Sequence, residues 1–166
     1  SSSAASDVYK RKSLSGVPSW MLVLIKAVLK KTGREYLTDV WPNLEVFFHG
    51  GISFEPYREQ YKTLIPSNKM HYMETYNASE GFFGLQDDPT DSSLLMMPDY
   101  GIFYEFIPMN EVGNAHPTVL PLESVETGKN YAMVITTSGG LWRYQIGDTV
   151  RFTSLFPHKF VISGRT

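Results

Sequence analysis

The sequence predicts an α/β fold. A parallel sheet with flanking helices is expected in the first half, and an antiparallel β sheet or small distorted barrel in the second half. In the first half, helical periodicity alternates with short apolar runs, which is typical of a parallel sheet with helices packed on it. In the second half, strand-like segments are separated by turn sequences such as Ser138-Gly139-Gly140.

The first predicted element is a helix between Pro18, which suits a first helical turn, and Gly33, which suits a helix end. Apolar residues at helical spacing are expected to form its inner stripe, with lysines on the outside. The residues of this predicted stripe are Trp20, Val23, Leu24, Ala27 and Val28. The next segment, LEVFFHGG at 44–51, predicts a short buried strand that ends in a glycine pair.

A second helix is predicted from Pro56 to Pro66, followed by a strand at 69–76, KMHYMETY. In parallel sheets, ligands collect beyond the carboxyl ends of the strands. Gly50-Gly51 and residues 76–80 follow two predicted strands, so both are expected at that edge. In the second half, the clearest alternation of apolar and polar residues is at 103–107, FYEFI.

Composition excludes several classes of protein. The 166 residues are 42% hydrophobic and 14% aromatic, which argues for a globular chain rather than a disordered one. A net charge of −2 does not provide the excess of positive charge that is typical of nucleic-acid-binding proteins. The absence of cysteine excludes disulfides and fits a reducing, cytoplasmic setting. The four histidines are scattered, so only carboxylates remain as ligands for a metal such as Mg²⁺.

The longest apolar run, residues 20–29, is broken by Lys26 and is too short to span a bilayer, so no membrane association is expected. Neither common glycine-rich phosphate fingerprint occurs. The His49-Gly50-Gly51 sequence is like an esterase oxyanion loop, but the chain has no G-x-S-x-G motif, which argues against a serine hydrolase. Asn77-Ala78-Ser79 matches a glycosylation acceptor and is discounted because no secretory signal is seen.

The segment TYNASEGFFG at 75–84 has two interpretations. It is either a strand with an ordinary turn, or a site in which Tyr76 stacks on a base, Ser79 donates to a phosphate oxygen and Glu80 holds Mg²⁺. The segment WRYQIGDTVRF at 142–152 is either strand, turn and strand, or a place where Gly147 allows close approach and Asp148 accepts two ribose hydroxyls.

Four motifs, taken in order, resemble the GH3 family of acyl acid–amido synthetases, and the segments LSGVPSW, WPNLEVFFHGG and FEPYREQY resemble its bacterial members. The four motifs are residues 76–80 (YNASE), 104–106 (YEF), 144–150 (YQIGDTV) and Gly164-Arg165, and the likeness extends from about residue 13 onward. The resemblance implies part of an adenylate-forming domain. Such an enzyme uses ATP and Mg²⁺ to convert a carboxylic acid into an acyl-adenylate, and then transfers the acyl group to an amine such as an amino acid.

The resemblance also implies roles for individual residues. Ser79 and Glu80 would be catalytic, with Ser79 at the α-phosphate and Glu80 as the Mg²⁺ ligand. The implied nucleotide-binding set is Gly50, Gly51, Tyr76, Asn77, Ala78, Ser79, Asp148 and Arg165, in which Tyr76 packs on adenine, Asp148 binds the ribose and Arg165 lies at a hinge. The implied substrate pocket comprises Trp20, His49 and Gly50.

The family's phosphate loop and mobile C-terminal domain have no counterpart among these residues, so the chain is expected to be an inactive fragment. The expected division is 1–12 as a flexible lead-in or cloning remnant, 13–97 as the α/β nucleotide-binding portion, 98–162 as a β-rich subdomain and 163–166 as the start of the hinge. Three alternatives stay open: a ligase with a thiol acceptor, a non-catalytic nucleotide- or acyl-binding module, and a pure interaction domain.

Overall fold

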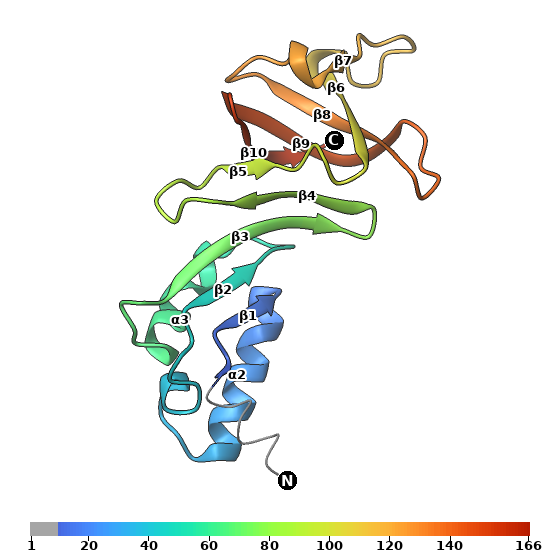
Figure 1. The fold of residues 1–166 in the computed structure, drawn as a ribbon. Coiled ribbons are helices and arrows are strands. Elements are labelled where there is room, and N and C mark those ends of the chain that lie inside the picture. Colours follow the sequence, from blue (N-terminus) through green and yellow to red (C-terminus); the bar gives the residue numbers. More distant parts are fainter. Residues whose placement is uncertain (1–9) are drawn as a thin grey trace. The chain divides into compact units, whose positions relative to one another are not determined.

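The computed structural model of this chain describes residues 10–166 (Figure 1). Most of the segment predicted as a lead-in, residues 1–12, lies outside that described part. The chain divides into two compact units, and the division falls between Thr75 and Tyr76 inside one strand. The boundary expected from the sequence, at 97–98, stays a prediction about the domains of a longer protein.

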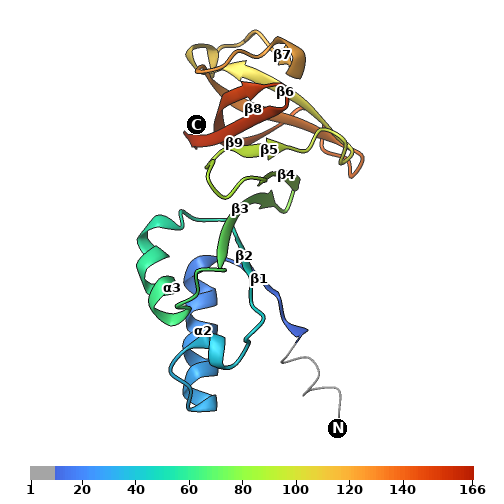
Figure 2. The same ribbon diagram turned by 60° about the vertical axis from the view of Figure 1, so that its left-hand side comes forward.

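The first unit contains a parallel sheet, as predicted. Strand β1 (Ser13–Gly16) pairs with β2 (Val46–His49), and β2 pairs with the first part of β3 (His71–Ala78), both in parallel. Two helices, α2 (Pro18–Thr32) and α3 (Arg58–Leu64), lie on the same side of these strands (Figure 2). The sheet and helices therefore form the two layers expected from the alternating pattern.

The limits of α2 match the prediction, because both depend on local backbone chemistry. Proline occupies the first turn, and Gly33 ends the helix in the left-handed region at φ 66°. The predicted inner stripe is wrong. The buried face carries Leu22, Ile25 and Leu29, whereas Trp20 is 75% exposed.

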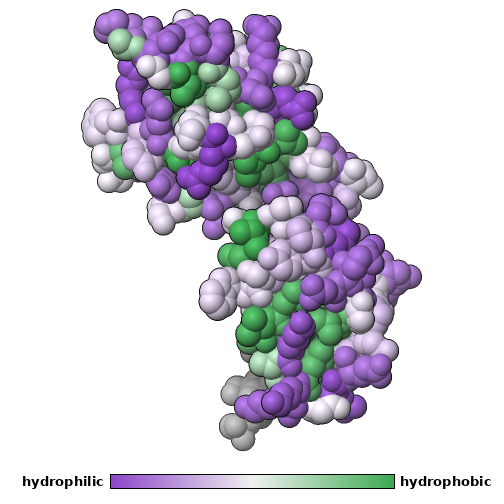
Figure 3. All heavy atoms as spheres, turned by 180° about the vertical axis from the view of Figure 1, so that it is seen from behind, coloured by the Kyte–Doolittle hydropathy of each residue, from purple (hydrophilic) through white to green (hydrophobic). Residues whose placement is uncertain are grey.

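Most of the other predicted stripe residues are exposed as well, namely Val23, Leu24 and Ala27. The cause is that α2 is apolar around most of its circumference, so periodicity alone does not tell which arc faces the sheet. Figure 3 shows hydrophobic side chains reaching the surface of the unit that holds α2.

The second predicted helix begins as a 3-10 turn, η2 (Glu55–Tyr57), and continues directly as α3. The Tyr61 hydroxyl, which is buried, donates a hydrogen bond of 2.8 Å to the carbonyl oxygen of Pro18 and so ties α3 to the start of α2. A further 3-10 turn, η1 (Leu37–Asp39), lies between α2 and β2. The buried apolar residues of this unit are Leu14, Leu22, Ile25, Leu29, Leu37, Leu44, Phe47, Phe54, Tyr61, Ile65 and Met70.

The second unit is an antiparallel sheet. Its strands are β4 (Gly81–Gln86), β5 (Leu94–Met96), β6 (Ile102–Pro108), β7 (Leu120–Pro121), β8 (Asn130–Thr137), β9 (Tyr144–Leu155) and β10 (His158–Arg165). Two 3-10 turns, η3 (Met109–Glu111) and η4 (Leu122–Ser124), flank β7. Across residues 10–166 the strand order is linear and runs β4-β5-β10-β9-β8-β6-β7 in this unit, so it is an open sheet rather than a closed barrel.

The core of the second unit comes from one face of these strands. It is rich in aromatic residues, which pack edge to face, as Phe106 does on Phe152 at a centroid distance of 5.1 Å. Tyr76, at the end of β3, belongs to this core. No helix in the described part of the chain is both long and apolar enough to cross a bilayer.

Candidate functional site

The first candidate segment forms the end of β3 and a tight turn. Strand β3 continues to Ala78, two residues beyond its predicted end, and Ser79-Glu80 make the two-residue turn into β4. The strand-and-turn interpretation of this segment is therefore correct for its backbone. A functional role depends on where the side chains lie.

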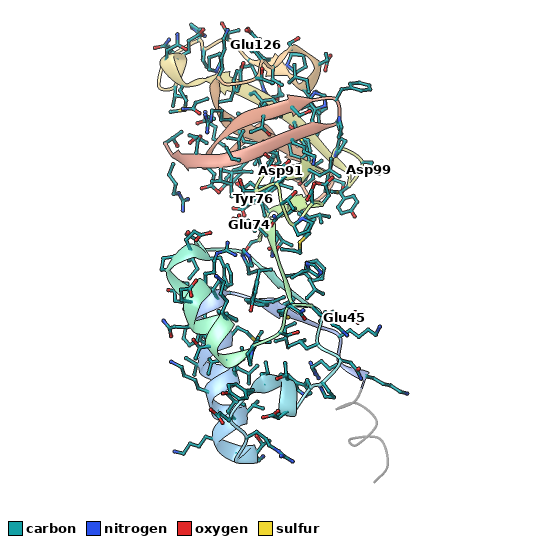
Figure 4. All side chains as sticks on the ribbon, turned by 90° about the vertical axis from the view of Figure 1, so that its left-hand side faces the viewer. Glu45, Glu74, Tyr76, Asp91, Asp99 and Glu126 are labelled. Atoms are coloured by element: carbon teal, nitrogen blue, oxygen red, sulfur yellow. The ribbon has the colours of Figure 1, made fainter. Side chains whose placement is uncertain are left out.

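Tyr76 lies in the core of the second unit. Its side chain is 6% exposed, and its ring packs against Phe83 at 4.9 Å and Phe160 at 6.1 Å between centroids. The Tyr76 hydroxyl donates a hydrogen bond of 2.6 Å to Oδ2 of Asp148. Burial and this carboxylate together raise the pKa of Tyr76 far above its usual value. The phenol therefore stays protonated and serves as a fixed donor to Asp148. Figure 4 labels Tyr76 at the end of β3.

Asp148 sits in a β-bulge rather than in the turn that the sequence allowed. Ala132 of β8 pairs with Thr149 of β9, and Val134 of β8 pairs with Gln145 of β9. The one residue between Ala132 and Val134 therefore faces three residues of β9. Gly147, at φ 88°, supplies the backbone conformation that this bulge needs. Bulges of this kind re-aim a side chain, and here the re-aimed side chain is the Asp148 carboxylate.

Arg165 approaches the other oxygen of the same carboxylate. It pairs with Asp148 in the β9–β10 ladder, and its Nε lies 3.3 Å from Asp148 Oδ1. The Thr166 backbone N–H donates to the Gly147 carbonyl oxygen at 2.9 Å, which holds the end of β10 against the bulge. The Arg165 side chain is 76% exposed, so this ion pair is weak and easily exchanged. Asp148 thus has one buried partner, Tyr76, and one exposed partner.

The structure brings together the candidates Tyr76, Asp148 and Arg165. Glu80 is also close enough to contribute to the raised pKa of Tyr76, although as the smallest of its causes. Ser79 is exposed on the turn, and Asn77 and Ala78 are exposed on β3. The Tyr76–Asp148 hydrogen bond could not be foreseen from either motif, because it joins positions 72 residues apart.

The remaining candidates belong to the first unit. Gly50 and Gly51 directly follow β2, as predicted for the carboxyl end of a strand. A Cβ on Gly50 would lie 2.3 Å from the carbonyl oxygen of Thr75, and the Thr75 hydroxyl donates to the His49 carbonyl at 3.2 Å. Only glycine permits this approach of the two backbones. Gly51 has φ 81°, a conformation that also favours glycine.

His49 is 4% exposed and stacks on Phe54 at a centroid distance of 4.3 Å. Its Nδ1 is buried and has no hydrogen-bond partner among residues 10–166. Burial, followed by the nearby Arg58 charge, lowers the pKa of His49 to about 4, so the ring is neutral near pH 7. Trp20, the third residue of the expected substrate pocket, is largely exposed on α2.

The described residues contain no cluster of three or more His, Asp or Glu side chains that could hold a metal ion. Mg²⁺ in nucleotide sites is commonly held by one or two carboxylates, with substrate phosphates and water completing its shell. A single carboxylate on a hairpin turn, as at Glu80, fits that kind of site and does not fit an all-protein metal cage.

Comparison with known proteins identifies the family. The GH3 family N-terminal domain matches residues 2–70, and the GH3 family central domain matches residues 95–165. The chain belongs to the GH3 family. Its relatives include the indole-3-acetic acid-amido synthetase GH3.8 of Oryza sativa subsp. indica, which is 37% identical over 128 residues, or 70% of this chain. This GH3 chain spans 20% of the length of that relative.

Solved structures show the same fold. A GH3.15 acyl acid amido synthetase in complex with 2,4-DB superimposes with a TM-score of 0.73 at 17% identity, covering 96% of this GH3 chain and 37% of that structure. A 2-hydroxyisobutyryl-CoA ligase has a TM-score of 0.64 at 16% identity, covering 94% of this chain and 36% of the other. The predicted fold class, α/β with a parallel sheet and helices in the first half and an antiparallel sheet in the second half, is confirmed.

Proposed function

We propose that this GH3 chain carries the ribose-binding part of an ATP-dependent acyl acid–amido synthetase. The longer enzyme would adenylate a carboxylic acid and transfer the acyl group to an amine such as an amino acid. The observation that carries the proposal is the Asp148 carboxylate, fixed by a 2.6 Å hydrogen bond from a buried tyrosine in a chain of this family. The names of the relatives support the amide-forming class.

The proposed role of Asp148 is to accept hydrogen bonds from the ribose hydroxyls. A carboxylate has about four lone-pair sites, and Tyr76 occupies one of them. The exposed Arg165 can leave its site on Oδ1 when a ligand arrives. Tyr76, whose ring faces are taken by the core, acts here as a positioning residue that holds the carboxylate in one rotamer.

Other roles follow from the family resemblance. Ser79 would donate to the α-phosphate, and Glu80 would hold Mg²⁺, which would neutralise charge on the phosphates. Gly50 and Gly51 would leave room for adenine and the acyl group. Adenylation makes the carboxylate a better acyl donor because its oxygen becomes part of a good leaving group. The protein contributes positioning and charge neutralisation.

The primary test is pyrophosphate exchange in the intact longer enzyme. Carboxylate-dependent exchange of labelled pyrophosphate into ATP is measured across a panel of acids, for wild type, Asp148→Ala and Glu80→Ala. We expect exchange with at least one acid and loss of more than about 100-fold in both variants, since each removes a charged contact to the nucleotide or its metal. ATP binding without exchange for any acid would support the non-catalytic module instead.

Tyr76→Phe separates the positioning role from folding. The substitution keeps the packed ring and removes the hydroxyl, so we expect ATP affinity to fall by about tenfold. Affinity for 2′,3′-dideoxy-ATP, which lacks the ribose hydroxyls, should hardly change. An equal loss for both nucleotides would show that Tyr76 does not act through ribose recognition.

The thiol acceptor is a second candidate, supported by the fold shared with the 2-hydroxyisobutyryl-CoA ligase. Supplying the activated acid with either coenzyme A or a set of amino acids distinguishes the two. Amide product without thioester favours the amido synthetase. The isolated 166-residue chain is proposed to be inactive, and adenylation by it alone would refute that part.

A further inference from the structure

A surface cavity of about 480 Å³ lies in the second unit and involves none of the proposed nucleotide residues. Its apolar lining includes Ile107 and Val134, both buried, together with Val119. Its polar lining comprises Arg143, Gln145 and His116. Ile107 and Val134 belong to a small apolar cluster that is separate from the main core of this unit. The volume is that of a site for a small organic molecule.

One wall of the cavity is a loop held closed by a carboxylate. Residues 115–117 line the cavity and belong to the connection between η3 and β7. Glu111, at the start of this connection, accepts the backbone N–H of Thr118 at 2.6 Å, and its carbonyl oxygen accepts the N–H of Asn114 at 3.1 Å. The segment that forms the wall is thus fixed at both ends.

Arg143 is held at the cavity in an unusual conformation. Its φ is 47°, a left-handed value that is costly for a residue with a side chain. Two contacts support this conformation. The Arg143 backbone N–H donates to Thr136 Oγ1 at 3.0 Å, and its Nε donates to Glu105 Oε2 at 3.0 Å. Neither Glu105 nor Arg143 has a role in the proposed nucleotide site.

The guanidinium keeps most of its hydrogen-bonding capacity. An arginine has five N–H donors, and the single Nε–H is the one that Glu105 accepts. Within the described part of the chain, neither Nη group of Arg143 has a hydrogen-bond partner. The arginine is also the one fully charged side chain of the lining. The cavity therefore offers a planar donor group, oriented by its contact with Glu105, next to an apolar floor, and this arrangement recognises a carboxylate attached to an apolar body.

We propose that this cavity is a second ligand site, which binds a small branched aliphatic or aromatic carboxylate. The Arg143 guanidinium would hold the carboxylate, and the apolar group would lie over Ile107 and Val134. A phosphate would pair with the arginine but gain nothing from the apolar floor, so the carboxylate is favoured. The site is independent of the proposed adenylation chemistry, because binding here requires neither nucleotide nor catalysis.

The test is a methyl NMR titration of the whole chain with 3-methylbutanoate. We expect saturable shifts of the Ile107, Val119 and Val134 methyl signals, with a dissociation constant of about 1 mM or tighter. The neutral 3-methylbutanamide should bind at least about tenfold more weakly, because it lacks the charge that pairs with Arg143. Inorganic phosphate should leave these methyl signals in place.

Two variants and a control make the test specific. Arg143→Lys keeps the charge but loses the planar fork, and should weaken binding at least about fivefold. Ala115→Trp, at an exposed loop position, fills the cavity and should abolish binding without touching the core. Arg151→Gln is the matched control, since Arg151 is an exposed arginine of β9, the strand that begins directly after Arg143, and it lies outside the cavity. Absence of saturation, equal binding of acid and amide, or unchanged binding by both variants would overturn the proposal.

Discussion

The buried histidine His49 predicts a pH-dependent loss of stability in the first unit. Its pKa is about 4 in the folded chain, against 6.5 for an ordinary histidine, because burial disfavours the charged ring. Stability from this depressed pKa is fully present above pH 6.5. It is lost as the pH falls toward 4, since the unfolded chain takes up the proton first. Between pH 7 and pH 5 the loss is about 2 kcal/mol, which corresponds to about 30-fold in hydrogen-exchange protection.

Hydrogen exchange of the β2 amides, corrected for intrinsic rates, measures this loss within the first unit. Strand β8 of the second unit serves as an internal reference. His49→Phe keeps a ring on Phe54 but cannot titrate. The ratio of the protection factor at pH 7 to that at pH 5 should therefore be about 30-fold smaller in this variant than in wild type.

The comparison with His49→Phe is necessary because Glu74, on the neighbouring strand, works in the opposite direction. Burial raises the pKa of Glu74, so the free-energy cost of burying its charged form disappears as the pH falls and the carboxylate takes up a proton. His71→Gln, at an exposed position of β3, is the matched control and should retain the wild-type fall in protection. If His49→Phe loses as much protection as wild type between pH 7 and 5, the assignment of the proton uptake to His49 is refuted.

Three further predictions concern stability. Gly50→Ala should lower the free energy of urea unfolding by about 3 kcal/mol, because the new Cβ would lie 2.3 Å from a backbone oxygen. Gly139→Ala is the control, since a Cβ there would meet its nearest neighbour at 3.6 Å. A cost for Gly50→Ala no larger than that for Gly139→Ala would contradict the prediction. Tyr61→Phe should cost about 1–2 kcal/mol by removing the buried hydrogen bond between the two helices, and an unchanged unfolding midpoint would argue against it. The hydrogen bonds from Thr118 lower the pKa of Glu111. The stability contributed by this contact is therefore present above the ordinary glutamate pKa and is lost as the pH falls below it. If the Thr118 amide is equally protected from hydrogen exchange in Glu111→Gln and in wild type, the role of the charge is refuted.

Local chemistry made the limits of α2 predictable, whereas its orientation depended on tertiary packing. Proline at the start and glycine at the end act through their own backbones, so they are visible in the sequence. The choice between the Trp20 arc and the Leu22 arc depends on which side meets the sheet. Both arcs satisfy helical spacing, and the local signal that favours the Leu22 arc is the placement of Lys30 and Lys31 on the same side of the helix as Ala27.

The candidate site shows the same division. Gly147 marked a special backbone position in the sequence, and its φ of 88° agrees with that interpretation. Whether the special position was a turn or a bulge depended on pairing with β8, which the local sequence does not encode. Asp148 could be singled out as a carboxylate next to a glycine. Its partner Tyr76 could be identified only from the folded chain.

The 72-residue separation of Tyr76 and Asp148 also sets the order in which this part of the molecule is completed. Synthesis releases β3 and β4 early, and the Tyr76 ring can then pack on Phe83. Its other contacts, Phe160 and the Asp148 carboxylate, belong to β10 and β9, which follow all the other strands of this unit in the sequence. Closing so long a loop costs chain entropy, which is recovered only when β9 and β10 pair. During synthesis, the oriented carboxylate is therefore among the last features of the second unit to form.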